Sequence, residues 1–376
     1  MKILHVYKTY YPHSLGGIEQ MIYQLCEGLP KYGIDCEVLT LSKNKSYSAK
    51  INNHTVNYAK LNFEYASTGM SISAIYIFYK LARKFDIIHY HFPWPFADIM
   101  HFSKFIKKPT ILTYHSDIVK QKHLLKLYTP LMHIFLKNVD KIVCTSPNYL
   151  ASSEILQQYK NKTQIIPIGI PKLDIDLDSP ENFSKVNYWQ NILKKPFFLF
   201  VGVLRYYKGL HFLIEAVQNA PYYVVIAGSG PLEQELKNKV YELKLENIIF
   251  VGEVSDQDKN ILFKLSYAFV FPSHIRTEAF GISLLEAAMH GKSMISCEIG
   301  AGMSFINKNN KTGYVIAPQN SEALRKAMDN LYNNPAINLE FAHNAKLRFE
   351  ELFTADKMCL EYSKIYKSIF KVIKPL

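Results

Sequence analysis

Two glutamates eight positions apart, Glu278 and Glu286, lie in the segment RTEAFGISLLEAAM, where a helix is expected to begin near Gly281. Glu278 then precedes the helix, and Glu286 lies on its second turn in an apolar run, where an unpaired carboxylate would be costly. Glu286 is therefore expected to have a specific partner. The amides of Phe280 and Gly281 have no acceptor within the helix and are suited to a phosphate group. Together these groups suit a phosphorylated sugar, with one carboxylate near the sugar and the other on ribose hydroxyls.

Cations and glycines combine in a second segment, GVLRYYKG, which follows a strand-like apolar run at residues 202–209. Arg205 and Lys208 lie three positions apart there and could bracket a diphosphate, with bidentate contacts from the arginine. Two solvated surface cations are the alternative. A later glycine turn, GSGP at residues 228–231, is interpreted as turn-forming only.

A third turn, SLGGIE at residues 14–19, follows the first expected strand and opens a helix. Gly16 and Gly17 would let backbone amides approach an anion closely, and the helix dipole favours negative charge at that end. Glycines that merely start a helix are the alternative.

Histidines mark two strand ends in the first half of the chain. His115 follows the apolar run ILTY, whereas His89 and His91 lie near the end of FDIIHYH. An imidazole could act at a reaction site, but any one histidine is more often structural. His115 is the candidate among them, because it stands directly at the carboxyl end of an expected strand.

Three alternating acids, Asp174, Asp176 and Asp178, could in principle bind a divalent metal ion. They are next to no phosphate-binding turn, so an exposed acidic loop is the favoured interpretation.

Short apolar runs alternate with longer amphipathic segments along the chain, which predicts parallel sheets with helices on both faces. The alternation stops at residues 171–195, which are rich in Pro, Asp and Asn and are expected to form a linker. We expect two doubly wound α/β domains, at 1–170 and 196–353, and a last helix at 354–376 that packs back on the first domain. The Asn- and Lys-rich segment SKNKSYSAKINNH is expected to be an exposed loop.

Composition excludes several classes of protein. The chain is 48% hydrophobic and 20% charged, which is unlike a disordered protein, a collagen or a disulfide-rich miniprotein. No stretch approaches the roughly 18 apolar residues that a membrane-spanning helix needs. The start, MKILHVYKTYYP, lacks the apolar region of a secretory signal and is expected to be a strand. Five scattered cysteines indicate reduced core thiols and hence the cytosol.

The positive charge lies almost entirely in the first half of the chain. Residues 1–170 contain 20 Lys and Arg against 10 Asp and Glu, whereas the remaining residues contain 24 against 22. A one-sided basic surface indicates a polyanion or an anionic membrane as partner. The chain lacks an RNA-recognition signature and a DNA-recognition-helix motif, so a nucleic-acid-binding protein is the weaker alternative.

These motifs together resemble those of the family 4 retaining glycosyltransferases, which have the GT-B architecture, and the resemblance covers essentially the whole chain. It rests on GGIE, TYHSD, LRYYKG and the two glutamates in PSHIRTEAFGISLLEAAMHGK. LRYYKG and SCEIGAGMSFIN are similar to segments of bacterial enzymes that add mannose, rhamnose or related sugars to lipopolysaccharide or O-antigen intermediates.

The resemblance implies a role for each matching residue. The donor diphosphate would be bound by amides near Gly16 and Gly17, by Arg205 and Lys208, and by amides at Phe280 and Gly281. Glu286 would bind the ribose, Glu278 would contact the transferred sugar, and His115 would line the reaction site. His13 and Asp117 are candidates for the acceptor side. Many relatives have an arginine where this chain has Val203, so Arg205 is the candidate replacement.

The implied reaction moves a hexose from a nucleoside diphosphate-sugar, expected to be GDP-linked, to a lipid-linked saccharide. Cations and helix N-termini would stabilise the departing diphosphate, so neither a metal nor another cofactor is expected. A UDP-sugar with another acceptor, an epimerase and a phosphorylase are the alternatives. The basic segments LARKF, HFSKFIKK and VKQKHLLKLYTPLMHIFLKNVDK are expected to contact the inner face of the cytoplasmic membrane.

Overall fold

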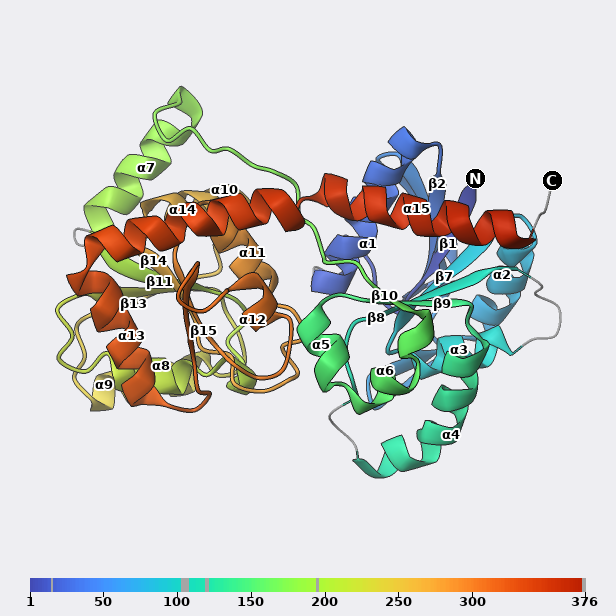
Figure 1. The fold of residues 1–376 in the computed structure, drawn as a ribbon, viewed down its shortest axis with the longest axis horizontal. Helices are drawn as coiled ribbons and strands as arrows, with labels where there is room; N and C mark the ends of the chain where they lie inside the picture. The colour runs from blue at the N-terminus through green and yellow to red at the C-terminus, as the bar shows by residue number, and fades with distance from the viewer. Residues whose placement is uncertain (15, 103–107, 119–121, 194–195, 374–376) are drawn as a thin grey trace. The chain divides into compact units, whose positions relative to one another are not determined.

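The computed structural model describes residues 1–14, 16–102, 108–118, 122–193 and 196–373. The chain forms two compact units (Figure 1). Unit 1 consists of Met1–Pro171 and Thr354–Leu376, and unit 2 of Lys172–Phe353. The divisions expected from the sequence lie at 170/171 and 353/354.

Unit 1 is built on an eight-stranded sheet in the order β10-β9-β8-β7-β1-β2-β4-β3, parallel except for β3. Its central strands are almost wholly buried, which explains their continuous apolar runs. The strands are β1 (Lys2–Val6), β2 (Asp35–Ser42), β3 (Tyr47–Ile51), β4 (His54–Lys60), β7 (Ile87–Phe92), β8 (Thr110–Tyr114), β9 (Lys141–Cys144) and β10 (Thr163–Ile165).

Helices and one small hairpin complete unit 1. The helices are α1 (Gly17–Gly28), η1 (Leu29–Tyr32), α2 (Ile72–Ala82), α3 (Pro95–His101), α4 (Lys122–Asn138), α5 (Pro147–Ser152), α6 (Glu154–Gln158), η2 (Lys160–Lys162) and α15 (Ala355–Ile373). The hairpin pairs β5 (Phe63–Tyr65) with β6 (Thr68–Met70).

The last helix, α15, packs against α1 and η1 of unit 1 (Figure 1). Two of its tyrosines reach the sheet: Tyr366 OH is 2.6 Å from His89 Nδ1, and Tyr362 OH is 2.8 Å from Thr113 Oγ1. The buried residues of α15 recur at helical spacing, which gives the helix one apolar face. They are Met358, Cys359, Tyr362, Ser363, Ile365, Tyr366 and Ile369.

The segment at residues 42–54 is not the exposed loop expected from its Asn and Lys content. It contributes β3 and the start of β4, which pair antiparallel at the edge of the sheet. A turn at Asn52 and Asn53 joins them, and Asn52 has φ 45°, a conformation that asparagine tolerates better than most residues. The ring of Tyr47 stacks on that of Tyr58 at 4.5 Å between centroids, which stabilises the pair.

Unit 2 is built on a six-stranded parallel sheet in the order β13-β12-β11-β14-β15-β16. Two doubly wound α/β sheets are thus confirmed. The strands are β11 (Phe197–Val201), β12 (Tyr223–Ala227), β13 (Ile248–Gly252), β14 (Ala268–Phe271), β15 (Met294–Cys297) and β16 (Gly313–Ile316). The helices are α7 (Pro180–Ile192), η3 (Tyr206–Lys208), α8 (Leu210–Ala216), α9 (Glu233–Glu242), α10 (Asp256–Leu265), α11 (Ile282–Met289), α12 (Met303–Ile306), α13 (Ser321–Asn333) and α14 (Pro335–Leu352).

The expected linker at 171–195 is wrong over half its length, because α7 occupies it. Helix α7 packs on α10 and buries Val186 and Trp189. Asp258 at the start of α10 accepts hydrogen bonds from Trp189 Nε1 at 3.1 Å and from Lys185 Nζ at 2.6 Å. The helix escaped sequence analysis because only a few of its residues are apolar, so its periodicity is weak.

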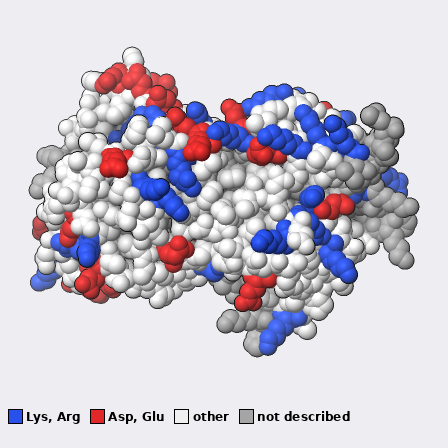
Figure 2. All heavy atoms as spheres, in the orientation of Figure 1, with Lys and Arg blue, Asp and Glu red and all other residues white. Residues whose placement is uncertain are grey.

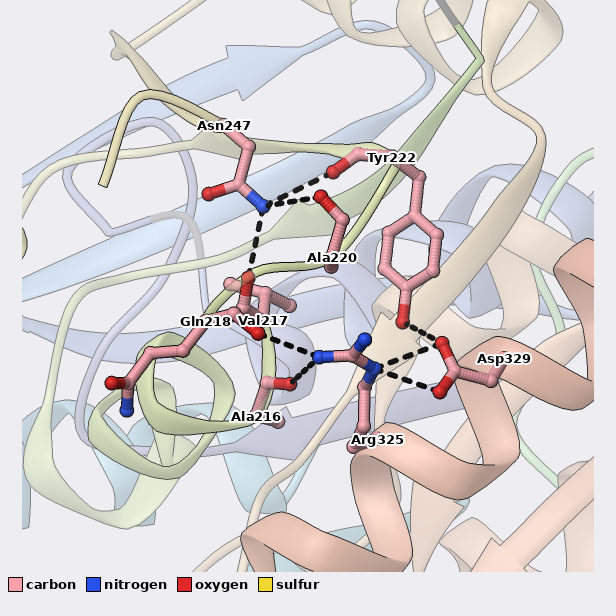
Figure 3. A network of polar contacts seen from close by, with 8 residues as sticks. All are labelled: Ala216, Val217, Gln218, Ala220, Tyr222, Asn247, Arg325 and Asp329. Carbon is pink, nitrogen blue, oxygen red and sulfur yellow. Dashed lines mark hydrogen bonds and ion pairs between the residues drawn. The ribbon is translucent and has the colours of Figure 1, made fainter.

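A polar network closes the end of α8 and the loop that leads into β12 (Figure 3). Asn247 Nδ2 donates to the carbonyls of Val217 at 2.9 Å, Tyr222 at 3.2 Å and Ala220 at 3.4 Å. The last carbonyls of a helix find no N–H donor within it, so they and the carbonyls of the loop that follows need such donors when they are shielded from water.

Arg325 on α13 completes this network (Figure 3). Its Nη1 donates to the carbonyls of Gln218 at 2.7 Å and Ala216 at 3.3 Å. Its Nε faces both carboxylate oxygens of Asp329, at 2.9 and 2.8 Å, and Asp329 also accepts from Tyr222 OH at 2.8 Å. The network therefore ties α13 to the end of α8 and to the loop that leads into β12.

All five cysteines are buried free thiols, which confirms the expectation from their spacing. Among the described helices, none combines the length and the apolar character needed to cross a lipid bilayer.

The Asn247 network predicts that Asn247→Ala destabilises unit 2. The substitution leaves three carbonyls without their common donor, which should lower the free energy of unfolding by about 1–3 kcal/mol in urea denaturation. Asn238→Ala is the matched control, because Asn238 is exposed and, among the described residues, its side chain has a hydrogen bond only with Gln234 of its own helix. Equal stability of the two variants would contradict the role of Asn247.

Candidate functional site

In an open parallel sheet, ligands bind beyond the carboxyl ends of strands where the strand order reverses. In unit 2 this reversal lies between β11 and β14. The loop after β11 contains Arg205 and Lys208, and the loop after β14 contains Glu278. Because β11 and β14 are neighbouring strands, the two loops lie beside each other although they are some 70 residues apart in the sequence.

Lys208 and Glu278 form an ion pair at this point, with 2.5 Å between Lys208 Nζ and Glu278 Oε2. The two side chains are only 9% and 13% exposed. The ammonium group also lies 4.5 Å from the ring centre of Phe271, at the end of β14. This ion pair is well shielded from water and lies beyond the carboxyl ends of two strands. It can supply a cation for an anionic ligand and a carboxylate of fixed orientation.

Arg205, the other predicted cation of the turn, is exposed at its start. Its carbonyl accepts the amide hydrogen of Lys208 at 3.0 Å, which shapes the turn. The structure therefore separates the two predicted cations into a buried lysine, which holds Glu278, and an arginine directed to the surface.

The GSGP turn after β12 has the structural role expected of it. A side chain at Gly228 would meet the carbonyl oxygen of Gly202 at 2.1 Å, and one at Gly230 would meet the backbone of Leu204 at 2.6 Å. The amide of Leu204 donates to the carbonyl of Ser229 at 2.9 Å. These glycines let two turns pack backbone against backbone.

His274 is a further candidate that sequence reasoning missed, although it stands in the same segment as the two glutamates. Its amide donates to the carbonyl of Tyr207 at 2.9 Å, so the β14 loop lies on the β11 turn. Neither ring nitrogen has a hydrogen-bond partner in the part of the chain that the structure describes. Burial lowers the pKa of His274, with a further contribution from His211.

Helix α11 begins as expected, with Gly281 at its N-cap and φ 95°. Glu286 lies on its second turn, and the specific partner inferred from its apolar setting is Lys259 of α10, at 2.8 Å. Burial raises the pKa of Glu286, an effect that Lys259 opposes. Phe280 is buried and packs edge-on against Phe353.

In unit 1 the strand order reverses between β1 and β7. A cavity of about 470 Å³ lies beside the loop after β1, lined in part by Lys8, His13, Ser14, Lys43 and Glu64. His13 Nε2 is 2.9 Å from Tyr47 OH on β3. The cavity thus combines cations, a carboxylate and hydroxyl groups at the edge where a polar ligand is expected.

The paired glycines lie at the start of α1, next to this cavity. Gly16 is the N-cap, and a side chain there would meet the Glu19 carboxylate at 2.4 Å. Glu19 accepts a hydrogen bond from Ser14 Oγ at 2.6 Å. A carboxylate at this position is favoured by the helix dipole, and it shows that the turn accommodates an anionic group.

His115 lies directly after β8, at the carboxyl end of the strand as expected, and is 4% exposed. Its Nε2 is 3.0 Å from His91 Nδ1. Burial lowers the pKa of His115 to about 3, so the ring is neutral.

Asp117 has partners within unit 1. Its Oδ1 accepts from Tyr114 OH at 2.8 Å and from Ser153 Oγ at 2.7 Å, and its amide donates to Tyr149 OH at 2.5 Å. These bonds tie the loop after β8 to α5 and α6.

Asp174 is one of the three alternating acids that the sequence places in the expected linker. Its carboxylate pairs with Lys264 at 3.2 Å.

Two buried groups bring possible metal ligands within 4.8 Å of one another: His5 with Cys26 and Cys36, and His5 with His89 and His91. Burial raises the pKa of the Cys36 thiol, whereas a metal binds the thiolate. Both nitrogens of His89 and of His91 are already hydrogen bonded. We therefore assign no metal to either group.

The chain is similar to known proteins along its whole length. Residues 15–172 match the family described as Glycosyltransferase Family 4, and residues 186–348 match Glycosyl transferases group 1. It is 48% identical to O-antigen chain mannosyltransferase C of Escherichia coli, over 99% of each chain. It is 50% identical to the D-rhamnosyltransferase WbpZ of Pseudomonas aeruginosa, over 94% of this chain and 93% of the relative. Its fold is similar to that of sucrose-phosphate synthase from Thermosynechococcus elongatus, with a TM-score of 0.79, 20% identity and 99% of each chain covered.

The Lys259–Glu286 pair predicts a pH-dependent loss of stability in Lys259→Met. Without Lys259 the pKa of Glu286 rises further above its ordinary 4.5, so the folded state takes up a proton that the unfolded state releases. The penalty is small near pH 4.5 and grows as the pH rises through the folded-state pKa. Urea denaturation should show a loss of about 1.5–3 kcal/mol at pH 8 and less at pH 5.

The control for this prediction is Lys237→Met. Lys237 pairs with Glu233 on the surface of α9, with 45% and 29% of the side chains exposed, so its removal should cost under about 0.5 kcal/mol at either pH. A Lys259→Met penalty that is independent of pH would contradict the pairing.

Proposed function

Since this chain belongs to the family 4 glycosyltransferases of GT-B architecture, we propose that it adds mannose or rhamnose from a GDP-sugar to a lipid-linked saccharide. The chain is a hexosyltransferase, and its relatives support a place in O-antigen synthesis. The proposed transfer retains the anomeric configuration of the sugar. The observation that carries the proposal is the Lys208–Glu278 pair at the strand reversal of unit 2.

Lys208 and Glu278 suit the two charges that develop when the sugar–phosphate bond breaks. Negative charge grows on the diphosphate and positive character on the anomeric carbon. Lys208 can stabilise the first, together with Arg205 and the amides at Phe280 and Gly281. Glu278, held by Lys208, places a carboxylate beside the second.

Glu286 is proposed to bind the ribose of the donor. The ion pair with Lys259 fixes the orientation of its carboxylate at 2.8 Å. One carboxylate oxygen paired with a cation leaves the other available to accept hydrogen bonds from ribose hydroxyls.

Unit 1 is proposed to supply the acceptor side. The cavity near the loop after β1 presents Lys8, Lys43 and His13, and amides at Gly16 and Gly17 are proposed to approach the diphosphate. His115 is proposed to line the reaction site. No metal or cofactor is proposed, because cationic side chains and helix N-termini can offset the charge of the diphosphate.

Attachment of unit 1 to an anionic membrane is also proposed. Unit 1 has 25 Lys and Arg against 12 Asp and Glu, a net charge of +13, whereas unit 2 has 19 against 20. Lysine side chains follow the outer side of α15 in the face drawn in Figure 2. Helix α4 exposes Leu124, Leu127 and Ile134, with Leu127 80% exposed.

Such a mixture of lysines and exposed apolar side chains is typical of a helix that lies in a lipid interface. Parts of the basic segments proposed for this contact, residues 103–107 and 119–121, lie outside the described residues.

Donor binding tests the proposed function. We expect thermal-shift titration to show larger stabilisation by GDP-mannose or GDP-rhamnose than by UDP-, ADP- or dTDP-sugars, because only a bound ligand stabilises the fold. Glu286→Ala and Lys208→Ala should weaken donor binding about tenfold, whereas Glu278→Ala should chiefly lower kcat, by about 10²–10³-fold. Glu233→Ala, on the surface of α9, is the control.

Two results would overturn parts of this proposal. Full transfer rates in all three variants would show that the site is wrong. A larger shift with a UDP-sugar would show that the nucleotide is wrong and leave the site intact.

Membrane attachment predicts that the protein floats with vesicles containing anionic lipid and is released by moderate salt. Leu127→Glu should reduce flotation about tenfold, because it places a carboxylate in the apolar contact. Leu339→Glu is the matched control, since Leu339 is 69% exposed but lies on α14 of unit 2. Absence of flotation of the unmodified protein would exclude the idea.

A further inference from the structure

Three buried histidines form a continuous hydrogen-bonded chain across unit 1. His5 lies on β1, His91 on β7, and His115 follows β8, which are neighbouring strands of one sheet. His5 Nδ1 is 3.0 Å from His91 Nε2, and His91 Nδ1 is 3.0 Å from His115 Nε2. The rings are stacked, with 5.3 Å between centroids at both steps. The chain therefore ends at a residue proposed to line the reaction site.

Burial keeps all three rings neutral. The pKa values of His5 and His115 are lowered to about 3, and that of His91 is also lowered, chiefly by removal from water. A neutral imidazole carries one N–H and one bare nitrogen. Three rings thus share three protons among six nitrogens.

Proton counting leaves two arrangements. Each of the two hydrogen bonds uses one proton, and a neutral His91 must donate in one bond and accept in the other. Both bonds therefore point in the same direction, and the third proton lies at one outer end. It is on His115 Nδ1 if the bonds run from His5 to His115, and on His5 Nε2 if they run the other way.

The surroundings of His5 distinguish these arrangements. His5 is 0% exposed, and its Nε2 has no hydrogen-bond partner among the described residues. A buried N–H without an acceptor is rarer in proteins than a buried acceptor without a donor. His115 Nδ1 also has no hydrogen-bond partner among the described residues, but unlike His5 Nε2 it is not a fully buried unpaired atom, so a ligand can reach it.

We infer that His91 and His5 are positioning residues that hold His115 as a neutral ring with its proton on Nδ1, available to a hydroxyl oxygen of the sugar substrate. This inference rests on the proposed function, and it adds what His115 does there. With Nε2 accepting from His91 and Nδ1 protonated, His115 is a hydrogen-bond donor and not a general base.

His89 offers a matched control within the same strand. It is as buried as His91, and the two rings stack at 4.4 Å between centroids. Its nitrogens, however, bond to Tyr366 OH and Thr113 Oγ1 and not to the chain of three rings. Replacing His89 should therefore disturb packing without changing the protonation of His115.

The first test measures the protonated nitrogen directly. In full-length protein labelled with 15N-histidine, the ring-nitrogen shifts of His115 should show a protonated Nδ1 and a bare Nε2. His91→Leu should move the two shifts toward each other, because nothing then selects one tautomer, whereas His89→Leu should leave them apart. A protonated Nε2 on His115 in the unmodified protein would overturn the inference.

The second test separates positioning from packing. His91→Leu should lower kcat by about 10–100-fold with little change in the donor KM, because a misplaced group near the reacting atoms costs turnover. His91→Asn, whose amide lies near the position of Nδ1, should restore much of kcat. A merely structural role predicts the opposite order, since leucine suits a buried site better than asparagine.

The outcomes also separate this inference from the proposed function. If His115→Ala keeps full activity while the 15N shifts are as expected, the role of His115 in transfer is wrong and the tautomer assignment stands. If His115→Ala is inactive but His91→Leu loses no more activity than His89→Leu, the positioning role is wrong.

Discussion

Parallel strands place all their carboxyl ends on one edge of the sheet, and this constraint determines where the candidate residues of both units lie. Lys208 and Glu278 meet because they follow β11 and β14, which are neighbours in space though not in sequence. His91 and His115 meet because β7 and β8 are neighbours. Strand order thus converts residues that are distant in sequence into pairs that can do chemistry together.

Removal from water explains how these pairs behave. A shielded cation next to a shielded carboxylate interacts more strongly than the same pair at the surface, and each also limits the movement of the other. Among the histidines the same effect disfavours the charged ring, so the imidazole chain is a set of neutral dipoles. Glu286 shows both effects, because burial raises its pKa while Lys259 acts against that shift.

The proposed distribution of function between the units rests on charge and topology. Unit 1 contains the excess positive charge, the cavity beside the loop after β1 and the imidazole chain, which suits it to an anionic surface and a polar acceptor. Unit 2 is nearly neutral overall and concentrates its charge at the reversal between β11 and β14, which suits it to the donor. The last helix belongs to unit 1, where its tyrosines bond to His89 and Thr113.

Most strands could be predicted because a buried parallel strand is a continuous apolar run in the sequence. The start of α11 could be predicted because characteristic residue types mark the beginning of a helix. The edge hairpin of β3 and β4 could not, because an edge strand with one exposed face contains Lys and Asn as a loop does. Helix α7 escaped for a similar reason, since few of its residues are apolar.

The sequence by itself determined most of the succession of strands and helices, apart from the edge hairpin and α7, and the types of residue that stand at strand ends, because these depend on contacts a few positions apart. Only the tertiary structure decided the partners: Lys259 for Glu286, Lys208 for Glu278, and His91 between His5 and His115. Partners depend on which strands become neighbours, and the crossover connections that set this order leave no local pattern in the residues they join.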